Sequence, residues 1–228
     1  MFSCVGNDDD LRAVALGDDG ALAGMEEGGV FVDHTTASAM VERELAAIAE
    51  PRGISILDAP VSGGEEGAKN GVLTVMVGGD EAAFAKAEAA MASYGRAVTL
   101  MGPLGSGQLT KMVNQICCVG AVQGLAEGMN FAVRAGLDAK RVVDVISKGA
   151  AQSWQMDNRA VSMLEDRFDF GFAADWAHKD LGICLEEARA NGAMLPVTAL
   201  ADQFYSRVHD RGDGRMDWSV LMRLLTNP

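Results

Sequence analysis

Short apolar runs alternate with amphipathic helical patterns over residues 1–100. The apolar runs predict β-strands at 2–5, 30–33, 54–58, 72–77 and 97–100. The patterns between them predict α-helices near 9–16, 38–50 and 81–93. Strands that alternate with helices are typical of βα units, so residues 1–103 are expected to form an α/β domain with a largely parallel sheet.

Helical periods alone follow the segment Gly102-Pro103-Leu104-Gly105, and no strand-like run recurs. Residues 104–228 are therefore expected to form an all-α domain that begins with a long connecting helix near 106–134. Gly192 is expected to end one later helix, and Pro196 to lie in the first turn of the next.

Gly120, Gly124 and Gly128 take every fourth position of the long helix and so share one stripe. Each interior glycine costs about 1 kcal/mol relative to alanine. Glycine permits close approach of two backbones. The stripe is therefore expected to pack against another helix, either within the chain or across a homodimer or homotetramer.

The chain is acidic, with 19 Lys and Arg against 32 Asp and Glu and a formal charge of −13. Such a surface repels phosphates and anionic lipid, which argues against nucleic acid and membrane as partners. No signal-like leader is apparent, and polar side chains interrupt the long helix at Lys111, Asn114, Gln115, Gln123, Glu127 and Asn130. The protein is expected to be soluble and cytoplasmic. The four cysteines and three histidines lack zinc or disulfide spacing, so no metal is expected and the thiols are expected to be reduced.

A dinucleotide-binding sheet normally opens with a strand, a G-x-G-x-x-G turn and a helix. Nothing ahead of Val5 supplies this segment. The expected fold is therefore a partial Rossmann sheet whose first βαβ part, roughly 60 residues, is missing. A misassigned or artificial start at Met1 and a natural chain of this length both stay open.

One candidate for chemistry is the stretch Asp58-Ala59-Pro60-Val61-Ser62-Gly63-Gly64, which follows an expected buried strand. Open α/β sheets bind ligands at the carboxyl ends of their strands. Ser62 and the amides of Gly63 and Gly64 would suit a carboxylate, although a plain glycine-rich turn has the same composition.

A second candidate is Lys111, about one turn into the long helix, with Asn114 and Gln115 on the same face. Desolvation lowers the pKa of a lysine, which lets it exchange a proton with a substrate oxygen while an amide holds the hydroxyl. A solvated helix face is the ordinary alternative reading of this trio.

Three further segments belong with these two. Val5-Gly6 follows the first expected strand and Thr36 follows the second, so both fall at carboxyl ends of neighbouring strands. Lys179 opens an expected helix, where it is either a solvent-exposed lysine or a cationic contact to a cofactor.

Together and in order, these segments resemble the β-hydroxyacid dehydrogenase family, which includes 3-hydroxyisobutyrate dehydrogenase and tartronate semialdehyde reductase. The resemblance extends over essentially the whole chain. Its matching stretches are Asp33-His34-Thr35-Thr36, Asp58 to Gly64 with Gly67-Ala68, Leu73-Thr74-Val75-Met76-Val77-Gly78-Gly79, Gly105-Ser106-Gly107-Gln108, Lys111-Met112-Val113-Asn114-Gln115 and Lys179-Asp180-Leu181-Gly182.

The resemblance implies a small hydroxyacid substrate, NAD or NADP as cofactor, and Lys111 as the general acid/base. It implies that the substrate is bound by Ser62, Gly63, Gly64, Asn114 and Gln115, with Trp154 closing over it, and that the nicotinamide is bordered by Val5, Gly6, Thr36 and Lys179. Many members carry a second Asn where this chain has Gln115. Two alternatives stay open: a non-catalytic remnant that acts as an oligomerising or interaction module, and an imine reductase of related fold, which Lys111 disfavours.

Overall fold

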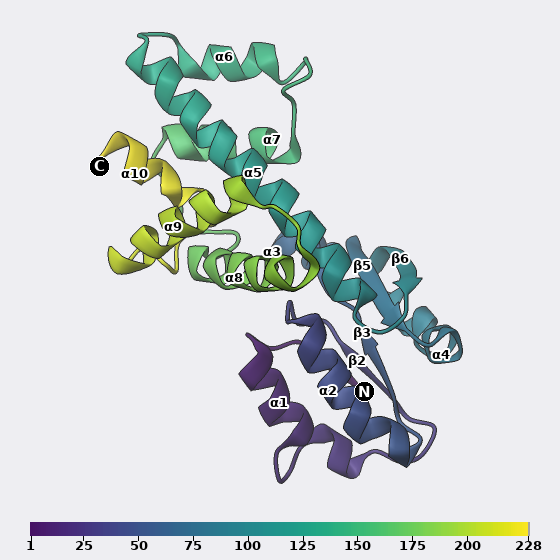
Figure 1. Ribbon diagram of the computed structural model, residues 1–228. Coiled ribbons are helices and arrows are strands. Elements are labelled where there is room, and N and C mark those ends of the chain that lie inside the picture. Colours follow the sequence, from purple (N-terminus) through teal and green to yellow (C-terminus); the bar gives the residue numbers. More distant parts are fainter. Residues whose placement is uncertain (228) are drawn as a thin grey trace. The chain divides into compact units, whose positions relative to one another are not determined.

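The computed structural model describes residues 1–227 and divides into two compact units, residues 1–113 and the residues from Asn114 onward. Each unit has its own hydrophobic core. The change from strands to helices falls between Gly102, which ends strand β6, and Ser106, which begins helix α5 (Figure 1). The division into units falls later, inside α5 itself.

The first unit combines a sheet with four α-helices (Figure 1). Its strands are β1 Phe2–Ser3, β2 Val30–Asp33, β3 Ser55–Asp58, β4 Val61–Ser62, β5 Leu73–Gly79 and β6 Gly95–Gly102. Its helices are α1 Asp8–Leu16, α2 Ala39–Ala49, α3 Gly64–Lys69 and α4 Glu81–Met91, with 3-10 turns η1 Ala21–Gly24 and η2 Glu50–Arg52. The five expected strands and three expected helices are confirmed with shifted ends, whereas β4 and α3 were not expected.

The sheet has the order β1-β2-β3-β5-β4, and β6 pairs with β5. β1, β2 and β3 run parallel to one another, as do β5 and β6. β5 runs antiparallel to both β3 and β4, so the expectation of a largely parallel sheet is wrong at this point. The reason is the connection: β4 and the short α3 lie between β3 and β5, in place of a helical crossover over the sheet.

Neighbouring residues of a strand face opposite sides of the sheet, which gives this unit two cores. Phe31 and Ile56 belong to the core that contains α1 and α2. Val32 and Leu57, the next residues along the same strands, belong to the core that contains α4. Burial on both faces explains why these strands read as continuous apolar runs.

In the described part of the second unit, the regular elements are all helices, apart from one isolated bridge. It consists of most of α5 Ser106–Arg134 with α6 Ala139–Ile146, α7 Trp154–Leu164, α8 Ala174–Asn191, α9 Pro196–Asp210, the 3-10 turn η3 Trp218–Leu221 and α10 Met222–Thr226 (Figure 1). The expected long helix is confirmed, as are Gly192 at the end of α8 and Pro196 at the start of α9. By length and composition α5 could cross a membrane, a test that the core helix of a globular protein also passes.

The glycine stripe of α5 does not approach another helix of this chain. Apart from the nearby backbone of α5 itself, a Cβ atom added at Gly120, Gly124 or Gly128 would meet no described atom within 4 Å. The within-chain half of the packing expectation is therefore wrong. Packing across a homo-oligomer stays a prediction.

Candidate active site

The glycine-rich segment after β3 turns back onto the sheet. Val61 and Ser62 form β4, which pairs antiparallel with Val75 and Thr74 of β5. Gly63 follows with φ 135° and Gly64 with φ 63°. L-residues with side chains rarely adopt these angles, so glycine is required here by the backbone. The expected loop is thus a short strand that ends at Ser62 and continues into the two glycines.

Lys111 is held against this segment. Its Nζ donates a hydrogen bond to the Val61 carbonyl oxygen at 2.9 Å. The residue is only 7% exposed although its side chain ends in an amino group. Lys111 therefore lies beside the peptide that leads into Ser62, and the structure brings these two predicted site residues together.

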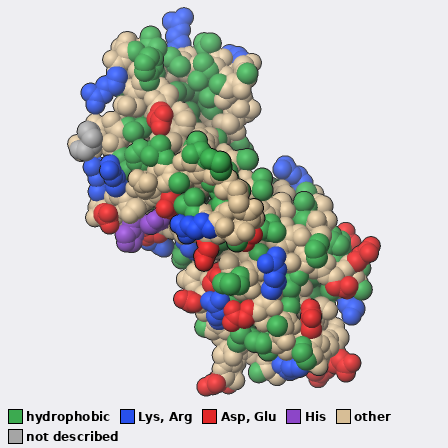
Figure 2. All heavy atoms as spheres, in the orientation of Figure 1, with side chains coloured by type: hydrophobic (Ala, Val, Ile, Leu, Met, Phe, Trp, Pro, Cys, Tyr) green, Lys and Arg blue, Asp and Glu red, His purple; other side chains and the backbone are tan. Residues whose placement is uncertain are grey.

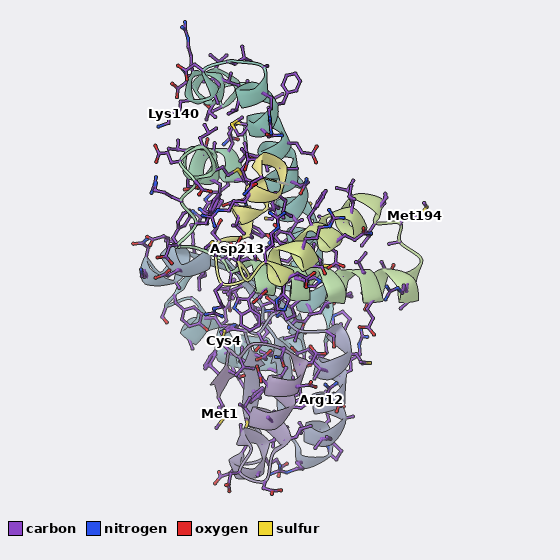
Figure 3. The ribbon with its side chains drawn as sticks, turned by 90° about the vertical axis from the view of Figure 1, so that its left-hand side faces the viewer. Met1, Cys4, Arg12, Lys140, Met194 and Asp213 are labelled. Carbon is purple, nitrogen blue, oxygen red and sulfur yellow. The ribbon has the colours of Figure 1, made fainter. Side chains whose placement is uncertain are left out.

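The turn after β1 is tied to the segment after β2. The Val5 amide donates to Thr35 Oγ1 at 2.9 Å, and the Thr35 hydroxyl donates to Asp33 Oδ1 at 2.8 Å. Val5, Gly6 and Thr36, the predicted cofactor-side residues, therefore border one buried threonine. Cys4, labelled in Figure 3, lies directly ahead of this turn.

A nicotinamide dinucleotide needs donors for its pyrophosphate and close backbone approach at its ring end. Neither α1 nor α2 offers donors for the pyrophosphate. α1 begins with Asp8, Asp9 and Asp10, and the Ser38 cap of α2 donates its amide and hydroxyl to Asp8. Residues Val5-Gly6 and Thr36 fit the second, since they offer backbone with short side chains. The residues described here therefore fit the nicotinamide end of the cofactor.

In the helical unit the side-chain amides of Asn114 and Gln115, which are predicted to bind substrate, form a chain of contacts with Asp180 and Lys179. Asn114 Nδ2 donates to Gln115 Oε1 at 2.8 Å, and Gln115 Nε2 donates to Asp180 Oδ2 at 2.6 Å. Lys179 Nζ lies 3.1 Å from Asp180 Oδ1. Gln115 is only 3% exposed and uses both amide atoms within the chain. Lys179 lies inside α8, and the expectation that it opens a helix is wrong because the helix already begins at Ala174.

Lys179 also lines a hollow of about 370 Å³ on the helical unit, together with Asp175, His178 and His209. His209 Nδ1 lies 2.8 Å from Asp175 Oδ1, and this contact raises the pKa of His209. The histidine side chains visible in Figure 2 stand out on this face beside acidic and basic groups. Among residues 1–227 no group of three or more His, Cys, Asp or Glu side chains could hold a metal ion.

Trp154 begins α7 and is 55% exposed. The Arg159 guanidinium lies 5.1 Å from the centre of its ring. The ring is thus supported from within the helical unit while much of its surface is open.

Sequence reasoning did not predict that a set of polar side chains would be buried next to the start of α5. Asp33, Glu42 and Asp58 are each 0% exposed and Gln108 is 1% exposed. Burial raises the pKa of Asp33 and Asp58. It raises the pKa of Glu42 further, and the nearby charge of Asp33 adds to this. The available signal was the position of two aspartates at the last residue of an apolar strand.

Comparison with known proteins places the chain in a family. The family described as "NAD-binding of NADP-dependent 3-hydroxyisobutyrate dehydrogenase" matches residues 105–225, and that described as "NAD binding domain of 6-phosphogluconate dehydrogenase" matches residues 1–102. An oxidoreductase of Shewanella frigidimarina is 60% identical over 99% of this chain and 77% of its own length. The chain belongs to the β-hydroxyacid dehydrogenase family.

Two other relatives have named activities. The 2-hydroxy-3-oxopropionate reductase of Escherichia coli is 32% identical over 99% of this chain and 77% of its own length. The crystal structure of a 3-hydroxyisobutyrate dehydrogenase from Salmonella typhimurium superposes with a TM-score of 0.89, at 29% identity, over 98% of this chain and 78% of that one. The protein is accordingly an NAD(P)-dependent oxidoreductase of this family, with a partial Rossmann sheet followed by an all-helical part.

Proposed function

We propose that this protein interconverts a small β-hydroxyacid and the corresponding semialdehyde or oxo acid, with Lys111 as the general acid/base. The observation that carries the proposal is the 2.9 Å hydrogen bond from Lys111 Nζ to the Val61 carbonyl. It joins a nearly buried amino group to the segment that leads into Ser62, so the proposed proton-transfer group and the proposed anion-binding segment share one location.

The substrate carboxylate would accept hydrogen bonds from the Ser62 hydroxyl and from the amides of Gly63 and Gly64. Glycine at both positions leaves the amides uncovered by side chains. A carboxylate fixed there lies within reach of Lys111, because Val61 precedes Ser62 directly. NAD or NADP supplies the hydride acceptor or donor when it is bound, and Val5, Gly6, Thr36 and Lys179 are proposed to border its nicotinamide end.

Lys111 would take the hydroxyl proton during oxidation and return it to the carbonyl oxygen during reduction. An amine that is held in place and desolvated exchanges a proton with a bound substrate more efficiently than an amine in bulk water. The 7% exposure of Lys111 and its bond to Val61 support that arrangement. Asn114 is proposed to hold the substrate hydroxyl, and Trp154 to close over it.

Gln115 is proposed to act through Asn114 within the substrate site, because its own amide atoms are bonded to Asn114 and Asp180. The longer side chain of Gln keeps this link to α8 while leaving the neighbouring Asn114 to meet the substrate. A cytoplasmic homodimer or homotetramer is proposed as the working form.

The decisive variant is Lys111→Ala, assayed by nicotinamide absorbance with 3-hydroxyisobutyrate, 2-hydroxy-3-oxopropionate and related acids. Removal of a general acid/base is expected to lower kcat by at least about 10²-fold, with a much smaller change in KM. Lys86→Ala, on the exposed side of α4, is the matched control and should keep full activity. Near-normal turnover by Lys111→Ala would exclude the assignment. A folded wild-type protein that binds NAD or NADP yet turns over none of these acids would favour a non-catalytic binding module.

A further inference from the structure

The carboxylate of Asp58 is buried at the last residue of β3 and accepts backbone hydrogen bonds from a distant segment. Asp58 Oδ1 accepts from the Gly105 amide at 2.7 Å, and Oδ2 accepts from the Gln108 amide at 2.7 Å. The side chain is 0% exposed. Removing a carboxylate from water is costly unless hydrogen bonds replace its hydration. Here one donor is the amide directly ahead of α5 and the other is an amide in its first turn.

The bond from the Gln108 amide is the one that a helix normally donates to the side chain of its own N-cap residue. Gly105 precedes α5 and has no side chain with which to cap it. Asp58 supplies the missing acceptor from 47 residues earlier in the chain. Its negative charge also lies at the positive end of the α5 dipole, which favours this placement.

The surrounding glycines leave space for this carboxylate. A Cβ atom at Gly78, the sheet partner of Asp58, would collide with Asp58 Oδ1. One at Gly107 would lie 2.8 Å from Oδ2 and nearer still to two backbone oxygens. The carboxylate is therefore enclosed on the sheet side and on the helix side, and a larger side chain has no room at position 58.

The same turn of α5 is bonded to the cofactor-side segment. Gln108 Nε2 donates to the Thr35 carbonyl at 2.7 Å, and Gln108 Oε1 accepts from the Ala37 amide at 3.1 Å. Lys111 follows Gln108 by three residues, so it projects from the same face of the helix one turn later. Any shift of the first turn moves Lys111 relative to both Val61 and Thr35.

We infer that Asp58 is a positioning residue for Lys111: it anchors the start of α5 so that the ammonium group stays aligned with the Ser62 segment. Asp58 touches neither substrate nor cofactor in this role. The inference rests on the proposed function only for its catalytic consequence, because the anchoring itself is a property of the fold.

The test variant is Asp58→Asn, which fills the same space but opposes one backbone N–H with its own NH2 group. We expect kcat to fall by roughly 10- to 100-fold while KM for the hydroxyacid changes less than about threefold, since misalignment penalises the transition state more than substrate binding. Lys111 should also become more reactive toward an acetylating reagent, as measured by mass spectrometry.

Asp80→Asn is the matched control, because Asp80 caps α4 in the same unit through a 3.0 Å bond to the Ala83 amide. The asparagine in Asp80→Asn would still offer a capping oxygen, so this variant should keep a near-normal melting temperature, whereas Asp58→Asn should lower the melting temperature and change kcat and Lys111 acetylation. Equal effects of the two variants, or an Asp58→Asn protein with normal kcat and normal acetylation, would overturn the inference.

Hydrogen exchange of the wild-type protein tests the anchoring without any variant or any activity. The Gly105 and Gln108 amides should exchange as slowly as amides in the middle of α5. Exchange at the rate of unprotected first-turn amides would refute the anchor even if Asp58→Asn failed to fold. Slow exchange of these amides in a protein that is inactive toward all hydroxyacids would support the anchoring role of Asp58 and contradict only the proposed function.

Discussion

Replacing Asp217 by alanine is expected to destabilise the helical unit strongly. The Asp217 carboxylate is 0% exposed and accepts four hydrogen bonds: from Arg159 Nε at 3.0 Å, the Phe172 amide at 3.0 Å, the Ser219 amide at 3.1 Å and Ser219 Oγ at 2.6 Å. Alanine would leave all four donors without this acceptor. It would also leave Arg159, whose side chain is 11% exposed, without its buried counter-charge.

Breaking a buried ion pair by removing one partner costs about 3–5 kcal/mol. For a unit of this size, each kcal/mol lowers the melting temperature by about 4 °C, which predicts a fall of roughly 10–20 °C. Circular dichroism at 222 nm follows the helices directly, and urea unfolding would supply the free energy independently.

Asp213→Ala is the matched control for this prediction. Asp213, labelled in Figure 3, lies 3.6 Å from Arg223 Nη1, and its side chain is 24% exposed. A partly exposed pair of this kind contributes at most about 1 kcal/mol. A melting temperature for Asp217→Ala within about 4 °C of the wild type, or no lower than that of Asp213→Ala, would refute the reasoning.

Three further outcomes are expected. Burial and the nearby charge of Asp33 raise the pKa of Glu42. The contribution of Glu42 to stability is therefore complete below its unfolded pKa of about 4.3 and is lost as the pH rises toward its folded pKa. Glu42→Gln should raise the melting temperature more at pH 8 than at pH 5, and an equal change at both pH values would contradict this. Gly124→Leu should leave the fold of the single chain intact, because no other part of the chain lies within 4 Å of the added Cβ. It should reduce the mass of the oligomer measured by light scattering, because the larger side chain would overfill a close contact between subunits. An unchanged mass would show that the stripe lies outside any interface. Trp154→Ala should raise KM for the hydroxyacid with little change in melting temperature, because the ring is 55% exposed, and an unaltered KM would argue against the closing role.

Much of the local structure follows from the sequence because its causes are local. The apolar runs at β2 and β5 and the helical period of α5 are set by neighbours within a few residues, and all three elements are confirmed. The cap of α4 by Asp80 is equally local, because the Asp80 side chain accepts a hydrogen bond from an amide three residues later. The ordered segments around Ser62 and Lys111 were enough to indicate the family, because they occur together in one chain.

The tertiary structure decided the features that depend on distant segments. β4 exists because Val61 and Ser62 pair with β5. The identity of these two residues alone does not predict that pairing. No other helix of the chain packs against the glycine stripe of α5. The spacing of the glycines places them on one face of the helix but does not determine whether another helix covers that face.

Asp58 shows the physical reason most directly. In the sequence it is one aspartate at the end of an apolar run, followed by a glycine-rich stretch. Its partners at Gly105 and Gln108 lie 47 and 50 residues away, and only folding brings their amides to its two oxygens. The sequence by itself determined which groups are available for chemistry and which elements carry them. Long-range burial and hydrogen bonding decided that this carboxylate would anchor the helix of Lys111.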